Sequence, residues 1–179
     1  RPEVAKFTND DKQDLKILNI CDPYVAEFFF GGKTIVVEGD TEYTAFNMLA
    51  SMMPNKYGDI HIIRARGKAT IVPLAKILNQ FGTPYAILHD SDRPTYKSKD
   101  GTTKANSAWA HNTSIKEITS TSKAGVRIIA SVPNFEEAYL NKECKEEKPY
   151  NALTRIKSED AVKKTIEVLL DALVDFTKP

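Results

Sequence analysis

The stretch that decides the fold is residues 34–42, TIVVEGDTE, in which a run of β-branched residues ends in a cluster of acids. Residues 34–38 have the composition of a buried strand. Asp40 or Thr41 can then cap a helix that reaches about residue 53, because apolar residues recur there at helical spacing. A buried strand that leads directly into a helix predicts the first half of a β-α-β unit.

The alternation of strands and helices continues outward from this stretch. We expect further strands at 60–64, 84–89 and 126–130, helices at 12–30, 70–81, 107–122, 134–144 and 158–176, and loops at 54–59 and 94–106. Strands separated by helices are typical of a parallel sheet whose faces are covered by those helices. The predicted fold class is therefore α/β, with a four-stranded parallel sheet flanked by helices and additional N- and C-terminal helices.

The composition is that of an ordinary globular protein. The chain has 179 residues, of which 41% are hydrophobic and 27% charged, and this excludes collagen-like, disulfide-scaffold and largely disordered classes. Its apolar runs are far shorter than the roughly 20 residues that cross a bilayer, so no membrane association is expected. Cys21 and Cys144 lack metal-type spacing, which favours free thiols and a cytoplasmic location. Because residue 1 is Arg, we expect a piece of a longer protein.

Acidic residues follow three of the four predicted strands. They form the pairs Glu38 and Glu42, Asp90 and Asp92, and Glu136 and Glu137. The carboxyl ends of parallel strands meet at one edge of a sheet, so we expect these side chains to converge. Clustered carboxylates repel one another unless a cation lies between them, and oxygen ligands of this kind favour Mg²⁺ or Mn²⁺. Their number predicts two ions roughly 3.5–4 Å apart, an arrangement that hydrolyses phosphodiesters.

Local details agree with a metal site. Asp90 and Asp92 face the same side if the chain between them is extended. Gly39 allows close approach of a ligand, and Glu42 lies near a helix N-terminus, where the dipole favours negative charge. Each residue alone also has a structural interpretation, as a helix cap (Asp40), the start of a turn (Asp92) or a solvated helix face (Glu136 and Glu137).

These motifs resemble the TOPRIM domain, which type IA and type II topoisomerases, bacterial primases and several nucleases share. The resemblance lies in IVVEGDTE at 35–42 and AILHDSD at 86–92. The subtype resembles the overcoming-lysogenization-defect (OLD) nucleases, because of AEFFF at 26–30 and PNFE at 133–136. The similarity spans residues 25–148.

The resemblance implies a Rossmann-like TOPRIM fold and three regions. These are a helical lead-in at 1–33, a catalytic core at 34–145, and a C-terminal loop and helix at 146–179. It also implies that the chain is the nuclease half of a protein whose N-terminal part is an ABC-type ATPase. Such a protein would cleave or nick DNA with two divalent ions, often in phage defence, and a partner helicase is left open.

The resemblance further implies roles for single residues. It matches Glu38, Asp90 and Asp92 to one metal ion, and Glu42 and Glu136 to the second, with Glu137 as the rival of Glu136. Lys148 matches a lysine that contacts the scissile phosphate and offsets developing charge. Its rivals are Lys142, Lys145 and Lys157, and Lys148, Glu42 and Asp90 are the expected catalytic residues.

Two local basic segments flank the expected site, although the net charge of the chain is only +1. The expected DNA contacts are Arg64, Arg66 and Lys68 after the second strand, and Arg93, Lys97, Lys99 and Lys104 after the third. Such patches bind phosphates without reading bases, and their binding weakens as salt rises.

The expected function is that of a metal-dependent DNA endonuclease or nickase. Three alternatives remain at this stage. The chain could be the TOPRIM domain of a primase or topoisomerase, an Asp-x-Asp phosphatase or glycosyltransferase, or a non-catalytic module in which the acids bind a structural cation.

Overall fold

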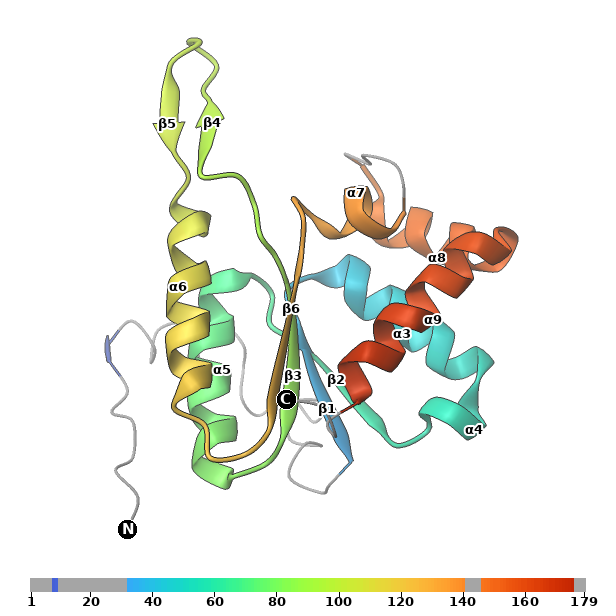
Figure 1. The fold of residues 1–179 in the computed structure, drawn as a ribbon. Coiled ribbons are helices and arrows are strands. Elements are labelled where there is room, and N and C mark those ends of the chain that lie inside the picture. Colours follow the sequence, from blue (N-terminus) through green and yellow to red (C-terminus); the bar gives the residue numbers. More distant parts are fainter. Residues whose placement is uncertain (1–7, 10–31, 141–145, 176–179) are drawn as a thin grey trace.

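The centre of the molecule is a four-stranded parallel sheet with the order β2-β1-β3-β6. The computed structural model describes residues 8–9, 32–140 and 146–175. The strands of the sheet are β1 (Lys33–Val37), β2 (Ile60–Arg64), β3 (Tyr85–Asp90) and β6 (Val126–Ser131). The α/β prediction is therefore confirmed, and all four expected strands are present within one or two residues of their expected bounds (Figure 1).

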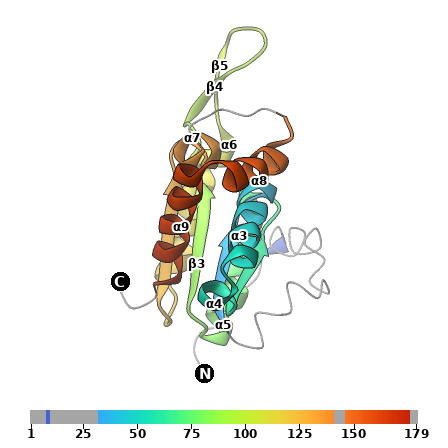
Figure 2. The same cartoon turned by 90° about the vertical axis from the view of Figure 1, so that its right-hand side faces the viewer.

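Helices cover both faces of this sheet. They are α3 (Asp40–Met52), α4 (Pro54–Tyr57), α5 (Lys68–Phe81), α6 (Ser107–Ser120), α7 (Phe135–Tyr139), α8 (Lys148–Ser158) and α9 (Asp160–Val174). α5 and α6 lie on one face, and α3, α8 and α9 lie on the other (Figures 1 and 2). None of the helices in the described part of the chain has the length and apolar character needed to cross a membrane.

The two central strands explain why the layers form. Successive side chains of a strand point to opposite faces of the sheet. Residues 34–37 of β1 and 85–88 of β3 are all buried, so both faces of these strands are covered. Val37 and Leu88 pack on the α3, α8 and α9 side, together with Phe46. Val36 and Ile87 pack on the α5 and α6 side.

Three predicted segments differ from the structure. Residues 54–59 are not only a loop, because Pro54 begins the short helix α4, as proline often does at a first helical turn. The expected loop at 94–106 contains a hairpin of β4 (Thr95–Lys97) and β5 (Thr103–Ala105). The segment before residue 158 is helix α8, where the prediction had a loop.

Other predictions stay untested. The expected helix at 12–30 and both cysteines lie outside the described residues, as does the part of the 134–144 helix beyond residue 140. The proposed division at residues 33 and 145 likewise stays a prediction.

The C-terminal helix is tied to the body by a polar contact as well as by the core. The Tyr57 hydroxyl donates to Asp171 Oδ1 at 2.6 Å, and Lys56 Nζ lies 2.8 Å from both Glu167 Oε1 and Asp171 Oδ2. The exposed ion pairs add little by themselves. Together these contacts join the end of α4 to Glu167 and Asp171, which lie one turn apart on α9.

The packing of α9 gives a test of the fold. Leu170 is fully buried, so Leu170→Ala should lower the free energy of unfolding by about 2–5 kcal/mol through the cavity that it leaves. Val168 on the same helix is 56% exposed, and Val168→Ala should change that free energy by no more than about 0.5 kcal/mol. Urea unfolding of both variants checks this, and equal losses would contradict the described packing.

Candidate metal centre

Two acidic side chains meet where the central strands end. Glu38 follows β1 directly, and Asp90 is the last residue of β3, the neighbouring strand. The Asp90 backbone N–H donates to Glu38 Oε2 at 3.0 Å. As expected, the ends of these two strands place Glu38 and Asp90 next to each other.

Two further carboxylates reach the same place from helices. Asp90 follows the side-chain alternation of Ala86 and Leu88, which places it on the α3, α8 and α9 side of the sheet. Glu42, in the first turn of α3, and Glu136, near the start of α7, are both 4% exposed. We call Glu38, Glu42, Asp90 and Glu136 the acidic cluster.

Short local contacts hold these carboxylates in place. The Phe135 backbone N–H donates to Asp90 Oδ1 at 2.8 Å, and the Thr41 hydroxyl donates to Glu136 Oε1 at 3.1 Å. Gly39 has an ordinary backbone conformation, so its role is to leave space. A Cβ atom added at Gly39 would lie 3.2 Å from Glu42 Oε2. The sequence did not single out Thr41 as a contact of the cluster.

Burial and mutual repulsion make the acidic cluster hold protons tightly. Burial, with the charges of Glu38 and Glu136 adding to it, raises the pKa of Glu42 to about 7. Burial, together with the charges of Glu42, Glu38 and Glu136, raises the pKa of Asp90 to about 8. Burial also raises the pKa of Glu38. Glu42 and Asp90 therefore tend to keep their protons near neutral pH, and a cation bound among the carboxylates could replace those protons.

One lysine already approaches the cluster. Lys148 Nζ, on the first residue of α8, lies 3.2 Å from Glu136 Oε1, and its side chain is 44% exposed. The structure thus places the expected Lys148 beside the carboxylates. Lys157 lies nine residues later on the same helix, roughly 13 Å along the axis. Lys142 and Lys145 lie outside the described residues.

Asp92 lies differently from Asp90. Its φ of +59° is left-handed, so the chain is not extended there and the two aspartates do not simply alternate toward one ion. The Asp92 carboxylate pairs with Lys68 Nζ, and both charges influence the pKa of Glu38. The expectation that Lys68 is an exposed DNA contact is wrong, since its side chain is only 3% exposed.

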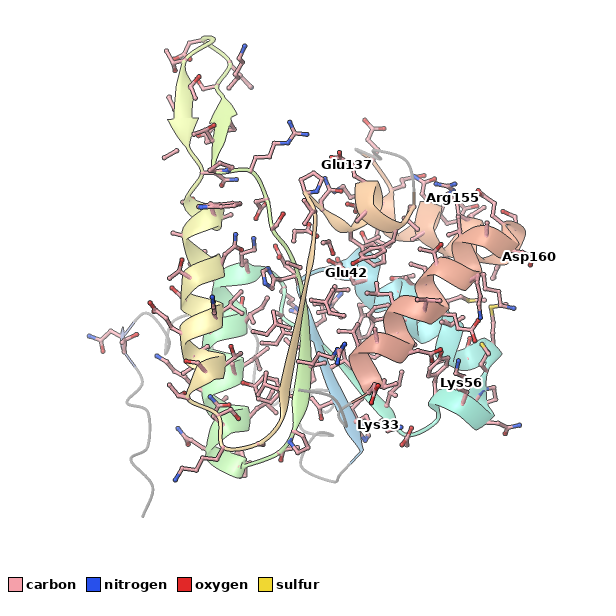
Figure 3. The ribbon with its side chains drawn as sticks, viewed as in Figure 1. Lys33, Glu42, Lys56, Glu137, Arg155 and Asp160 are labelled. Atoms are coloured by element: carbon pink, nitrogen blue, oxygen red, sulfur yellow. The ribbon has the colours of Figure 1, made fainter. Side chains whose placement is uncertain are left out.

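Glu137 turns away from the acidic cluster. It forms a reciprocal pair with the α7 cap residue: Asn134 Nδ2 donates to Glu137 Oε1 at 2.7 Å, and the Glu137 N–H donates to Asn134 Oδ1 at 2.9 Å. Figure 3 shows Glu42 between the end of the sheet and α7, whereas Glu137 lies at the outer side of that helix. Of the two neighbouring glutamates, only Glu136 joins the cluster.

The donor set fits a hard cation in its chemistry. Four carboxylates supply oxygen atoms, and buried acids with raised pKa values give up their protons more readily to a divalent ion than to water. Within residues 32–140 and 146–175, however, no three Asp, Glu, His or Cys side chains are already arranged around one metal position.

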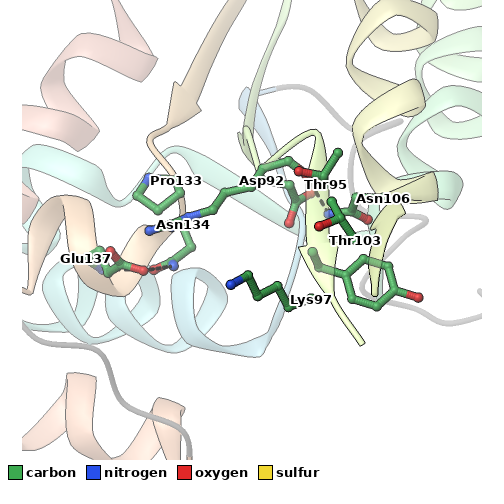
Figure 4. A pocket seen from close by; sticks show the side chains of 10 residues that line it. Asp92, Thr95, Lys97, Thr103, Asn106, Pro133, Asn134 and Glu137 are labelled. Carbon is green, nitrogen blue, oxygen red and sulfur yellow. Dashed lines mark hydrogen bonds between the residues drawn. The ribbon is translucent and has the colours of Figure 1, made fainter. Parts of the chain in front are cut away.

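Basic residues flank the acidic cluster on two sides. A groove beside Asp92 is lined by Arg93 and Lys97, and in Figure 4 the Lys97 side chain extends toward Asn134 and Glu137. A second groove, beside Glu38, is lined by Arg64 and Arg66. These placements agree with the expected phosphate contacts but do not test them.

Three of the expected basic residues either have a structural partner or lie farther out. Arg64 Nη1 lies 2.5 Å from Asp40 Oδ1, and its guanidinium carbon lies 5.4 Å from the Tyr43 ring centroid. Asp40 does not cap α3, because Gly39 occupies the cap position and Asp40 is the first residue of the helix. Lys99 and Lys104 belong to the β4–β5 hairpin, beyond the end of the sheet (Figures 1 and 2).

The raised pKa values predict how metal binding depends on pH. An ion must displace the protons of Glu42 and Asp90 below their pKa values of about 7 and 8, so Mg²⁺ affinity should rise about tenfold per pH unit or more between pH 6 and 7. Without metal the sign is opposite. The unfolded chain loses these protons near pH 4 and the folded chain only near 7–8, so stability should fall across that interval. Thermal unfolding with EDTA or Mg²⁺ measures both trends.

Asp90→Asn should weaken both trends, because the amide keeps the hydrogen bond from Phe135 but cannot titrate. Glu117→Gln, on the exposed surface of α6, is the matched control and should keep them. A pH-independent Mg²⁺ stabilisation in the native protein would contradict the described cluster.

Residues 29–92 match the family model described as overcoming lysogenization defect protein-like, TOPRIM domain. A comparison with curated proteins finds no match. The matched segment includes β1, α3, β2, α5 and β3, and therefore three of the four members of the acidic cluster. TOPRIM domains generally bind divalent metals, and they belong to enzymes of the nuclease and nucleotidyl-transfer type. Over residues 29–92, this chain is therefore similar to the TOPRIM domain of OLD-like proteins.

Proposed function

We propose that this chain is a divalent-metal-dependent DNA endonuclease or nickase that hydrolyses phosphodiesters with two Mg²⁺ or Mn²⁺ ions. The observation that supports it most is the meeting of Glu38, Glu42, Asp90 and Glu136 at one sheet edge beside Lys148. Arg66, Arg93 and Lys97 line grooves on either side, where a phosphate backbone would find cations.

The proposed roles follow from position. Glu38, Asp90 and Asp92 would hold one ion, and Glu42 and Glu136 would hold the second. Lys68 orients the Asp92 carboxylate, since the buried ammonium group pairs with it. Bound ions would supply an activated water and neutralise the departing 3′ oxygen.

Lys148 would act on the substrate. Its side chain is 44% exposed, so the ammonium group can leave Glu136 and contact the scissile phosphate once an ion neutralises that carboxylate. A fixed positive charge at that point stabilises the extra charge of the transition state.

The wider setting remains a proposal as well. By family resemblance, the nuclease would be joined to an N-terminal ABC-type ATPase domain and act in phage defence or DNA processing, with or without a helicase partner.

Neighbouring glutamates on α7 offer a matched test of the metal ligands. Glu136→Gln keeps the hydrogen bond from Thr41 but removes the charge, so nicking of supercoiled plasmid in Mg²⁺ or Mn²⁺ should fall by roughly 100-fold or more. Glu137→Gln should cleave within about threefold of the native rate, because Glu137 contacts only the cap residue among the contacts described. The reverse order would refute the proposed ligand set.

The same assay separates the alternatives. Plasmid cleavage by metal alone supports the nuclease, whereas metal binding without cleavage supports a non-catalytic module. Hydrolysis of p-nitrophenyl phosphate without plasmid cleavage would support a phosphatase, and primer synthesis would support a primase. Asp92→Ala is a poor choice of variant, since it leaves buried Lys68 unpaired and destabilises the fold.

A second pair of variants tests the lysine. Lys148→Ala should lower the cleavage rate by roughly 10²–10³-fold, while Mg²⁺ still stabilises the protein against heat. Lys157→Ala, on an exposed site of the same helix, should leave the rate unchanged. Equal rates for Lys148→Ala and the native protein would show that Lys148 is not the phosphate contact.

A further inference from the structure

The β4–β5 hairpin (residues 95–105) extends beyond the sheet and buries none of its strand residues. All six residues of β4 and β5 are exposed, and the two strands project past the end of α6 (Figures 1 and 2). A lone two-stranded hairpin is only marginally stable in water. Packing therefore does not explain why this hairpin has a regular structure.

Polar contacts at both ends of the hairpin hold its shape. At the tip, Asp100 accepts hydrogen bonds from the Ser98 hydroxyl and from the Thr102 N–H and hydroxyl, and these lower the pKa of Asp100 to about 2. At the base, Asn106 Nδ2 donates to the Arg93 carbonyl at 3.0 Å, and Asn106 also caps α6. The hairpin is thus an ordered arm that is fixed to α6.

The charges on this arm are nearly all positive and lie on both of its faces. Arg93, Lys97, Lys99 and Lys104 stand against the single acid Asp100, whose carboxylate is occupied by the turn. The register pairs Lys97 with Thr103 and Tyr96 with Lys104. Because alternate strand residues face opposite sides, Lys97 and Lys104 point in opposite directions.

A ribbon with cations on both faces fits between two phosphate backbones. The major groove of B-DNA is about 12 Å wide and admits a two-stranded β-ribbon, with phosphates along both of its walls. A single strand offers one backbone and would use one face. Since the Lys97 side chain lines the groove that contains Asp92 and Glu137, a duplex held by the hairpin would lie beside Asp92 and the start of α7.

We infer that the β4–β5 hairpin enters the major groove of duplex DNA and holds it by phosphate contacts from Lys97 on one face and Lys104 on the other. The inference rests on the proposed function in taking DNA as the ligand. It adds that the duplex is held through its major groove, and that this arm favours duplex over single-stranded DNA.

The test is fluorescence anisotropy with a 30-base-pair duplex and with one of its single strands, in EDTA, over a range of NaCl concentrations. Lys97→Ala and Lys104→Ala should each lower the slope of log K against log[NaCl] by about 0.9 for the duplex, and the double variant by about 1.8. For the single strand, which would use one face, the double variant should lower the slope by no more than about 0.7, the value of one contact. A double substitution of exposed Lys116 and Lys123, outside the hairpin, is the control and should leave both slopes unchanged.

An unchanged duplex slope, a dependence on only one of the two lysines, or an equal loss for single-stranded DNA would each overturn the inference. Because binding is measured without divalent ions, its outcome does not depend on cleavage. A protein that binds duplex through both lysines but cuts no plasmid would refute the proposed function and leave this inference standing.

Discussion

The structure depends on a conflict between folding and charge at one edge of the sheet. The core requires β1 and β3 to be buried along their length, and their ends bring Glu38 and Asp90 into the same protected place. Glu42 and Glu136 add two more carboxylates with almost no access to water. Protons or cations must compensate, because burying several like charges together is costly. A divalent ion bound among these carboxylates would offset this cost.

Two lysines pair with acids in this region, and they differ in burial. Lys68 is buried and paired with Asp92, so its ammonium group is held in place by the fold. Lys148 reaches Glu136 from the solvent side and can be displaced. A buried lysine can orient a neighbouring carboxylate, whereas an exposed lysine can move to contact another anion. The difference in burial between the two pairs therefore supports different roles for residues of the same type.

Much of the sheet and its acids could be predicted because both follow short-range rules. Strand residues such as Ile35 and Ile87 are β-branched and bounded by turns, and Glu38 and Asp90 come directly at strand ends. The hairpin was missed because its strands are short, polar and exposed, so no hydrophobic alternation marks them. The pairing of Lys68 with Asp92 was missed because it depends on the left-handed backbone of Asp92, which no local pattern predicts. Glu136 and Glu137 were inseparable until the cap at Asn134 was seen.

The contact between Lys148 and Glu136 depends on how the C-terminal helices pack. α8 packs against α3, and its Ala152 and Ile156 complete the core on that side, so the lysine arrives only when the C-terminal helices have docked. The segment recognised by the family model ends at residue 92, well before this helix. The segment that the family model matches is thus shorter than the part of the chain that brings Lys148 to Glu136. During synthesis Glu38, Glu42 and Asp90 would be made first, then Glu136 and finally Lys148, so this contact could form only after α8 had been made.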